Sequence, residues 1–250
     1  MKHALVTGAG SGIGAATARS LLDQGYRVSL LGRRLEALEE TVADYADGHH
    51  CAACDVTDPA QVSAAFNAAT DALGAIDILV NCAGAAPTSP FHKMPAAQWQ
   101  QVIDVNLNGV YHCCAQVVGD MRERGWGRII NIASTASLKG YAYVSAYCAA
   151  KHGVLGLTRA LALELAQKGV TVNAVCPGYT NTDIIRTAVA GIADKTGRTE
   201  AEALRTFTDT NPQGRLIEPQ EIADTVLWLC TDSARSITGQ ALSISGGETG

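Results

Sequence analysis

Short runs of aliphatic and β-branched residues alternate along the chain with longer amphipathic stretches. In the first long stretch Ala15, Ala18 and Leu22 repeat at helical spacing and so share one face. The short runs predict strands at His3–Thr7, Arg27–Leu31, His49–Cys54, Ile76–Val80, Arg128–Ala133, Val170–Val175 and Ala241–Ile244. The stretches between them predict helices at Gly12–Gln24, Leu35–Ala46, Pro59–Leu73, Pro95–Val118, Ser145–Gln167 and Pro219–Cys230.

Regular alternation of strand and helix is typical of a parallel sheet with helices on both faces. An eight-fold barrel shows the same alternation. A glycine-rich loop directly after the first strand favours the open sheet instead. No linker, charge block or internal repeat interrupts the 250 residues. We therefore expect one α/β domain over residues 1–250, a Rossmann-type doubly wound parallel sheet of about seven strands.

That glycine-rich loop reads Thr7-Gly8-Ala9-Gly10-Ser11-Gly12-Ile13-Gly14 and opens the first predicted helix. Glycines let the backbone turn tightly and approach a pyrophosphate, which then lies on the positive end of the helix. A plain strand-to-helix turn is the alternative interpretation. The context of strand, loop and helix favours a dinucleotide site.

The second strand bears on the choice of dinucleotide. NAD-binding sheets place a carboxylate near its end to bond the ribose 2′-hydroxyl. Here the strand ends in Gly32-Arg33-Arg34. A guanidinium suits a 2′-phosphate, although two solvated arginines at a helix start are the alternative. The sequence therefore predicts NADP, with NAD as the alternative cofactor.

Three further features follow in chain order. Asn81-Cys82-Ala83-Gly84 comes after the fourth strand, Asn106 lies midway along a helical pattern, and Ser134 ends the fifth strand. Tyr147 and Lys151 are four residues apart, so on a helix they share one face. A neighbouring ammonium favours the ionised form of a phenol. Each residue alone has an ordinary structural explanation, but their joint order favours a catalytic site.

Composition narrows the function classes. The formal net charge is −5 and no run of five Lys or Arg occurs, so no nucleic-acid or membrane partner is indicated. No 18-residue apolar window predicts a transmembrane helix. The eight cysteines are too few for a disulfide framework, and the apolar stretch at the N-terminus is too short for a signal peptide. We expect a reduced, cytoplasmic enzyme.

One segment of the chain carries residues that could bind a metal. The segment His49-His50-Cys51-Ala52-Ala53-Cys54 contains a C-x2-C pair and two histidines. A structural zinc site needs a second ligand pair at suitable spacing, and none follows. The segment is better explained as the third strand, so we expect no metal.

Together these motifs resemble the short-chain dehydrogenase/reductase family over essentially the whole chain. Asp55-Val56 after the third strand and Cys176-Pro177-Gly178 after the sixth fall in the family order as well. The segments 129–134 and 172–178 look most like ketoreductases that act on 3-oxoacyl thioesters and polyketides. The resemblance implies a single dinucleotide-binding and catalytic domain with a substrate lid at about residues 180–215, hinged at Gly191 and Gly197.

The resemblance also implies roles for the residues. Tyr147 would protonate the carbonyl oxygen, Lys151 would bind the nicotinamide ribose and lower the pKa of Tyr147, and Ser134 would bond the substrate oxygen. Asn106 would hold a water that resupplies protons through Lys151. The implied cofactor contacts, besides Tyr147 and Lys151, are Gly8, Ser11, Gly12, Ile13 and Gly14 for the diphosphate, Arg33 for the 2′-phosphate, Asp55 and Val56 for adenine, Asn81, Ala83 and Gly84 for the ribose, and Pro177, Gly178 and Thr180 for the nicotinamide end.

Several positions depart from relatives. Cys82 replaces a second asparagine, and Ser11 replaces the basic residue of many NADP-using members. Ala136 and Val144 stand where D-3-hydroxybutyrate dehydrogenases carry carboxylate-binding residues, which argues against a small free acid. Gly125 stands where carrier-protein reductases place a basic docking residue.

The resulting hypothesis is an NADP-dependent oxidoreductase that transfers a hydride between nicotinamide and a ketone or secondary alcohol. The substrate most consistent with the resemblance is a 3-oxoacyl thioester or a related ketone, with CoA as one candidate carrier of the acyl group. The alternatives are an NAD-dependent secondary-alcohol or 3-hydroxyacyl-CoA dehydrogenase and a non-catalytic nucleotide sensor. The resemblance further implies a homotetramer built on the 95–118 and 145–167 helices.

Overall fold

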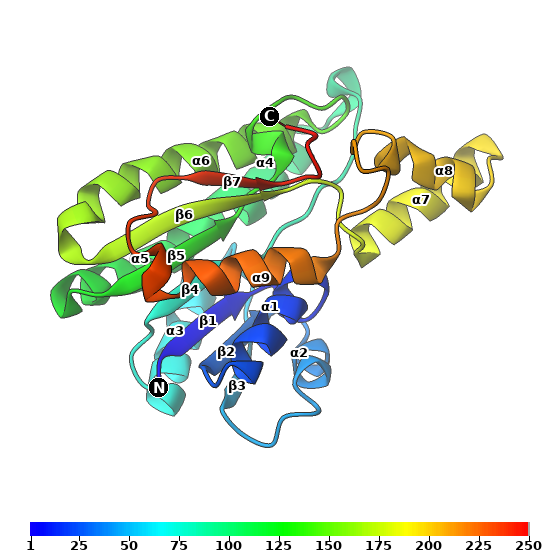
Figure 1. The fold of residues 1–250 in the computed structure, drawn as a ribbon. Helices are drawn as coiled ribbons and strands as arrows, with labels where there is room; N and C mark the ends of the chain where they lie inside the picture. Colours follow the sequence, from blue (N-terminus) through cyan, green and yellow to red (C-terminus); the bar gives the residue numbers. More distant parts are fainter. Residues whose placement is uncertain (250) are drawn as a thin grey trace.

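A computed structural model describes residues 1–249, and across them seven parallel strands form one sheet (Figure 1). The strand order is β3-β2-β1-β4-β5-β6-β7, so the chain reverses its direction of winding between β1 and β4. This open order confirms the doubly wound sheet and excludes the barrel. The strands are β1 His3–Thr7, β2 Arg27–Gly32, β3 His49–Ala53, β4 Ile78–Asn81, β5 Gly127–Ile132, β6 Val170–Pro177 and β7 Ala241–Ile244.

Helices cover both faces of the sheet (Figure 1). The face with α1, α2 and α9 buries one apolar cluster, and the face with α3, α5 and α6 buries the other. Two further helices, α7 and α8, project from the sheet near the carboxyl ends of its strands (Figure 1). The helices are α1 Gly12–Asp23, α2 Leu35–Thr41, α3 Pro59–Leu73, α4 Ala96–Ile103, α5 Gly109–Arg124, α6 Ser145–Leu165, α7 Asp183–Thr196, α8 Glu200–Thr208 and α9 Pro219–Leu229.

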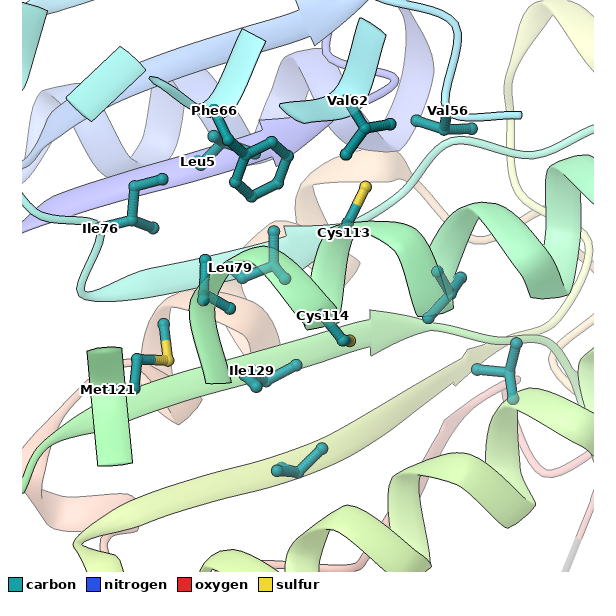
Figure 2. Packing of buried hydrophobic residues seen from close by; sticks show 14 of the residues in the cluster. Leu5, Val56, Val62, Phe66, Ile76, Leu79, Cys113, Cys114, Met121 and Ile129 are labelled. Atoms are coloured by element: carbon teal, nitrogen blue, oxygen red, sulfur yellow. The ribbon is translucent and has the colours of Figure 1, made fainter. Parts of the chain in front are cut away.

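Figure 2 shows the core on the α3 and α5 side, where Phe66 of α3 packs toward Leu5 and Leu79 of the sheet. Cys113 and Cys114 lie in this core on α5, as small buried hydrophobes. Burial raises the pKa of the Cys114 thiol to about 12, which keeps it protonated. Both cysteines therefore act as packing residues of this core.

Local chemistry explains where the helices begin and end. Asp58 caps α3 by accepting from the amides of Ala60 and Gln61, and Pro59 occupies the first turn, where no hydrogen bond is lost. Helix α5 ends at Gly125, whose φ of 72° lies in the left-handed region that glycine tolerates. The predicted bounds of α3 were correct because these signals are local.

Two predicted helices were wrong in extent, and one predicted hinge was wrong. The single helix expected over 95–118 is α4, a π-helical turn over Asp104–Asn108, and α5, which continues to Arg124. The helix expected over 35–46 ends at Thr41. Gly191 lies inside α7 and is no hinge, whereas Gly197 ends that helix with a φ of 70°.

Candidate active site

The predicted site residues gather at the carboxyl ends of the parallel strands. The glycine loop follows β1, Asn81 ends β4, Ser134 follows β5, and Pro177 ends β6. The winding of the sheet reverses between β1 and β4, and ligands of open α/β sheets bind beside such a reversal, beyond the carboxyl ends of the strands. Four separate segments therefore meet where a ligand is expected.

The glycine loop is packed so closely at Gly8 and Gly14 that a side chain would not fit at either position. A Cβ on Gly14 would lie 2.2 Å from the carbonyl oxygen of Gly8, and a Cβ on Gly8 would lie 2.9 Å from the nitrogen of Ala83. The Thr7 hydroxyl accepts hydrogen bonds from the amides of Cys82 and Ala83, at 3.0 and 3.1 Å. Thr7 thus joins the loops after β1 and β4, a role that we did not predict.

The N-terminus of α1 fits an anionic group. Within residues 1–249, no side chain caps this end, and the Ser11 hydroxyl makes no capping bond. The first amides of the helix, from Gly12 to Gly14, are therefore available to a diphosphate, and the helix dipole favours the negative charge. Gly12 has a φ of 52°, and a Cβ there would lie 3.0 Å from Thr182 Cγ2, so this turn also meets the segment that begins α7. The residues present fit the diphosphate of a dinucleotide.

The end of β2 carries the residues expected at the adenosine. Gly32 pairs in register with Ala53, the last residue of β3, so the segment with Arg33 and the segment with Asp55 and Val56 leave the sheet from neighbouring strands. Arg33 is exposed and forms no hydrogen bond or ion pair with any other of residues 1–249. Asp55 Oδ1 accepts from the amide and hydroxyl of Thr57, at 2.9 and 2.8 Å, which holds the turn in place. The guanidinium of Arg33 is thus free to meet an anion.

The side chain of Asn81 is buried and bonds to the neighbouring strand. Its Nδ2 donates to Asn131 Oδ1 at 2.8 Å, and Asn131 Nδ2 in turn donates to the Thr158 hydroxyl at 2.9 Å. This buried amide chain ties β4 to β5 and α6. The backbone of Asn81 and of Ala83 is then what this segment can present to a ribose.

A π-helical turn brings Asn106 to the same edge. The side chain is fully buried, and its Nδ2 donates to the carbonyls of Ala85 and Val102, at 2.8 and 2.9 Å. A Cβ on Gly84 would lie 2.8 Å from Asn106 Oδ1 and 3.8 Å from Lys151 Nζ. Asn106, Gly84 and Lys151 therefore meet around one point, and π-helical turns are frequent at functional sites.

Ser134, Tyr147 and Lys151 form the centre of the arrangement. Lys151 Nζ donates to the carbonyl of Ile132, the last residue of β5, at 2.8 Å, and lies 5.6 Å from the centroid of the Tyr147 ring. Ser134 Oγ accepts from the amide of Ala136 at 3.1 Å and also hydrogen-bonds the Tyr147 phenol. The hydroxyl, phenol and ammonium thus converge at the end of β5.

Burial governs the proton affinities here. It raises the pKa of Tyr147 to about 12, against the opposing effect of the hydrogen bond to Ser134. It lowers the pKa of Lys151 to about 8. The predicted lowering of the Tyr147 pKa by Lys151 stays a prediction, because in the protein alone burial is the largest influence on that pKa and raises it. At neutral pH the phenol keeps its proton and the lysine remains largely charged.

Residues 2–193 match the family model for short chain dehydrogenases. The chain belongs to the short-chain dehydrogenase family. It is 45% identical to a putative ketoacyl reductase of the monensin polyketide synthase from Streptomyces virginiae, with 98% of this chain and 95% of that protein covered. It is 38% identical to a D-beta-hydroxybutyrate dehydrogenase from Rhizobium meliloti (strain 1021), with 99% and 98% covered. The structure of a single-residue variant of actinorhodin polyketide ketoreductase with NADPH superposes with a TM-score of 0.94, at 38% identity, with 99% and 97% covered.

As a short-chain dehydrogenase the protein is an oxidoreductase that uses a nicotinamide dinucleotide. The segment expected at the nicotinamide end follows β6. The amide of Gly178 donates to the carbonyl of Ile244 at 3.0 Å, and the Thr180 hydroxyl donates back to the carbonyl of Gly178 at 3.0 Å. Thr180 also pairs with Ile217. These bonds fix the position from which α7 departs in this short-chain dehydrogenase.

No group of three His, Cys, Asp or Glu residues within 1–249 is arranged to hold a metal, and His49–Ala53 form the edge strand β3. Among the same residues, no helix is long and apolar enough to cross a membrane. The residues that sequence reasoning missed are Thr7 and Thr182, which lack a distinctive motif, and Glu248, which the chain brings back from its far end.

Proposed function

We propose that this protein reduces a neutral ketone to a secondary alcohol with NADPH, and that the ketone belongs to the 3-oxoacyl thioesters or related polyketide-like compounds. The single observation that carries the proposal is the protonated phenol of Tyr147 beside Ser134 and the buried ammonium of Lys151. A positioned acid that keeps its proton at neutral pH suits the reduction of a carbonyl.

NADPH, when bound, supplies the hydride that the carbonyl carbon receives. Tyr147 gives its proton to the carbonyl oxygen, and the Ser134 hydroxyl donates a hydrogen bond to the same oxygen as negative charge develops there. The nearby ammonium of Lys151 stabilises the phenolate that the transfer leaves behind. Asn106 stands next to Lys151 at the point where water can return the proton.

The chain's own residues favour an uncharged substrate. Ala136 is buried in the turn after Ser134, and Val144 lies just before α6, so neither offers a partner to a carboxylate. The base of α7 and α8 packs Tyr179 and Phe207 edge to face, with ring centroids 5.0 Å apart. We infer that α7 and α8 form a substrate lid with an apolar inner side, within residues 180–215.

An acyl carrier protein is a weaker candidate than a CoA thioester or a free ketone. Arg124, which precedes the position where carrier-protein reductases place a basic docking residue, is held by Asp77 and Asp120 at 2.6 and 2.7 Å and also donates to the Ile76 carbonyl. Its charge is therefore already paired. Arg122 and Lys168 remain exposed at this end of the molecule.

A homotetramer in the cytoplasm completes the proposal. Exposed apolar side chains on α5 and α6 support burial against other copies: Tyr111 is 59% exposed and Leu163 is 82% exposed. All eight cysteines are free, in keeping with a reducing compartment. Light scattering at micromolar concentration should show a species near four times 26.0 kDa. A species of one chain alone would exclude the tetramer.

The direct test is a panel of ketones with NADPH and NADH, followed by the absorbance of the reduced nicotinamide. The matched pair is an acetoacetyl thioester and free acetoacetate, with quinones, steroid ketones and sugar ketones as further members. We expect turnover of the thioester with NADPH and little turnover of acetoacetate. Preference for NADH over NADPH, together with oxidation of a 3-hydroxyacyl-CoA by NAD+, would instead identify an NAD-dependent dehydrogenase. Tight NADPH binding with no turnover of any member would identify a nucleotide sensor.

A further inference from the structure

The segment after β7 folds back onto the loop that follows Ser134. At its end, the Glu248 carboxylate is almost fully buried, with 2% of the side chain exposed. Glu248 Oε1 accepts a hydrogen bond from the Tyr141 hydroxyl and forms an ion pair with Lys139 Nζ at 3.1 Å. A buried carboxylate is stable only when it is paired in this way, so these two bonds are what holds the end of the chain against the loop.

The hydrogen bonds continue from the carboxylate toward the catalytic serine. The Tyr141 oxygen also lies 2.7 Å from the Thr135 hydroxyl. Because Tyr141 has one proton and gives it to the carboxylate, the Thr135 hydroxyl must donate to Tyr141. Thr135 is the residue after Ser134 and begins the short 3₁₀ turn that the Ser134 hydroxyl caps. The chain of hydrogen bonds from Glu248 thus ends one residue from the substrate-binding hydroxyl.

Glu248 contacts the base of α7 as well. A Cβ on Gly178 would lie 3.1 Å from Glu248 Oε2, so the carboxylate rests against the segment that follows β6. The ring of Tyr141 packs against the ring of Tyr179, with centroids 6.0 Å apart, and Tyr179 packs against Phe207 of α8. One buried carboxylate therefore joins the loop after Ser134, the base of α7 and the end of the chain.

We propose that Glu248 is a positioning residue for ketone binding: through Tyr141 and Thr135 it fixes the loop that carries Ser134 relative to Tyr179 at the base of α7. The proposal rests on the proposed ketone reduction at this site. Within residues 1–249, Glu248 forms no hydrogen bond or ion pair with the cofactor-binding glycine loop, Tyr147 or Lys151. It does approach Gly178 at the expected nicotinamide end, but the amide of Gly178 is held by the Ile244 carbonyl, a bond that does not involve Glu248. Its loss should therefore weaken the capture of the ketone and leave the capture of the dinucleotide intact.

The test compares Glu248→Ala, Glu248→Gln and Tyr141→Phe with the wild type and with Glu123→Ala, an exposed glutamate at the end of α5 that serves as control. We expect Glu248→Ala to raise the KM for the ketone by about tenfold or more, the loss typical of a hydrogen bond to a buried charge, while the KM for NADPH changes by less than about twofold. Glu248→Gln keeps an acceptor oxygen for Tyr141 and should recover most of that loss. Tyr141→Phe should reproduce the effect of Glu248→Ala, and the double variant should be no worse than either single variant.

A second measurement does not depend on turnover. In the wild type and the variants, hydrogen exchange should show faster exchange of residues 135–144 and around Tyr179 in Glu248→Ala, with the glycine loop unchanged. An unchanged ketone KM in Glu248→Ala and Tyr141→Phe, additive effects in the double variant, or unchanged exchange of residues 135–144 would each overturn the proposal. Absence of ketone turnover in the wild type would instead refute the proposed reaction, and the exchange experiment would still decide whether Glu248 positions the loop.

Discussion

Cofactor choice at the end of β2 gives a prediction whose size follows from the structure. Arg33 is exposed and has no partner within residues 1–249, so its guanidinium is free to bond the 2′-phosphate of NADPH. A charge-assisted bond of this kind contributes about 1.5–3 kcal/mol, or roughly 10- to 150-fold in binding. The exposed position favours the lower end of this range, because water and salt screen the charge. We expect kcat/KM to favour NADPH over NADH by about tenfold or more.

The perturbation is Gly32→Asp combined with Arg33→Ala. Gly32 has no positive φ, so aspartate can adopt its backbone conformation, and a Cβ there would lie 3.2 Å from Leu38 Cδ2. The end of the leucine side chain must move by a few tenths of an ångström, which is a small cost. The new carboxylate repels a 2′-phosphate and bonds the ribose hydroxyls of NADH. The double variant should therefore prefer NADH.

The assay is steady-state kinetics of ketone reduction with each cofactor at fixed ionic strength. Arg34→Ala is the matched control, since Arg34 is also exposed and lies one residue further along, at the start of α2. We expect Arg33→Ala to reduce the NADPH preference by about tenfold and Arg34→Ala to change it much less. Equal or better efficiency with NADH in the wild type would show that the interpretation of β2 is wrong. A larger effect of Arg34→Ala would show that the wrong arginine was chosen.

Three further predictions concern protons, stability and packing. Burial lowers the pKa of Lys151 to about 8, so its ammonium is present below that pH and lost above it. The kcat/KM for ketone reduction should therefore fall as the pH rises through 8. A flat profile up to pH 10 would contradict this prediction. Burying that ammonium costs about 3 kcal/mol at neutral pH, but Lys151→Met also leaves the Ile132 carbonyl without its donor, at a cost of about 1–3 kcal/mol. Lys151→Met should therefore abolish turnover and keep Tm at pH 7 within a few degrees of the wild type in calorimetry. The Tm of the variant relative to the wild type should fall as the pH rises from 8 to 10 and the wild-type lysine loses its charge, and a Tm difference that does not change with pH would refute this. Gly14→Ala should weaken NADPH binding by about tenfold or more in a fluorescence titration. The reason is that the Cβ of the new alanine would lie 2.2 Å from the Gly8 carbonyl oxygen. Unchanged affinity would show that the glycine loop can relax to accept the methyl group.

Much of the fold could be predicted because its signals are local. Most strands are short runs of aliphatic or β-branched residues bounded by glycine or polar turn residues, and α3 carries its own cap and proline. The glycine loop and the Tyr147–Lys151 spacing are also local patterns, so the sequence alone located them. In the structure, the segments that carry these residues lie together at the carboxyl ends of the strands, because all strands of the sheet are parallel.

The parts that escaped prediction depend on contacts between distant segments. The π-helical turn around Asn106 continues the helical pattern of hydrophobic residues on both sides, and what distinguishes it is the bond from Asn106 to Ala85, 21 residues away in sequence. The raised pKa of Tyr147 arises from burial, which no spacing reveals. Glu248 reaches Tyr141 across 107 residues, and no motif in the last residues of the chain announces that contact.

The central claim is that Tyr147 is the acid of an NADPH-dependent ketone reduction, and Tyr147→Phe tests it most directly. The substitution removes the phenol hydroxyl and leaves the ring, so NADPH affinity should stay within about twofold of the wild type. Turnover of the acetoacetyl thioester, or of the best ketone in the panel, should fall by about 10² to 10⁴-fold, the usual contribution of a positioned acid. A variant that binds NADPH normally and keeps more than about a tenth of the wild-type kcat would contradict the account, since removal of an acid that contributes even 10²-fold must lower kcat further than that.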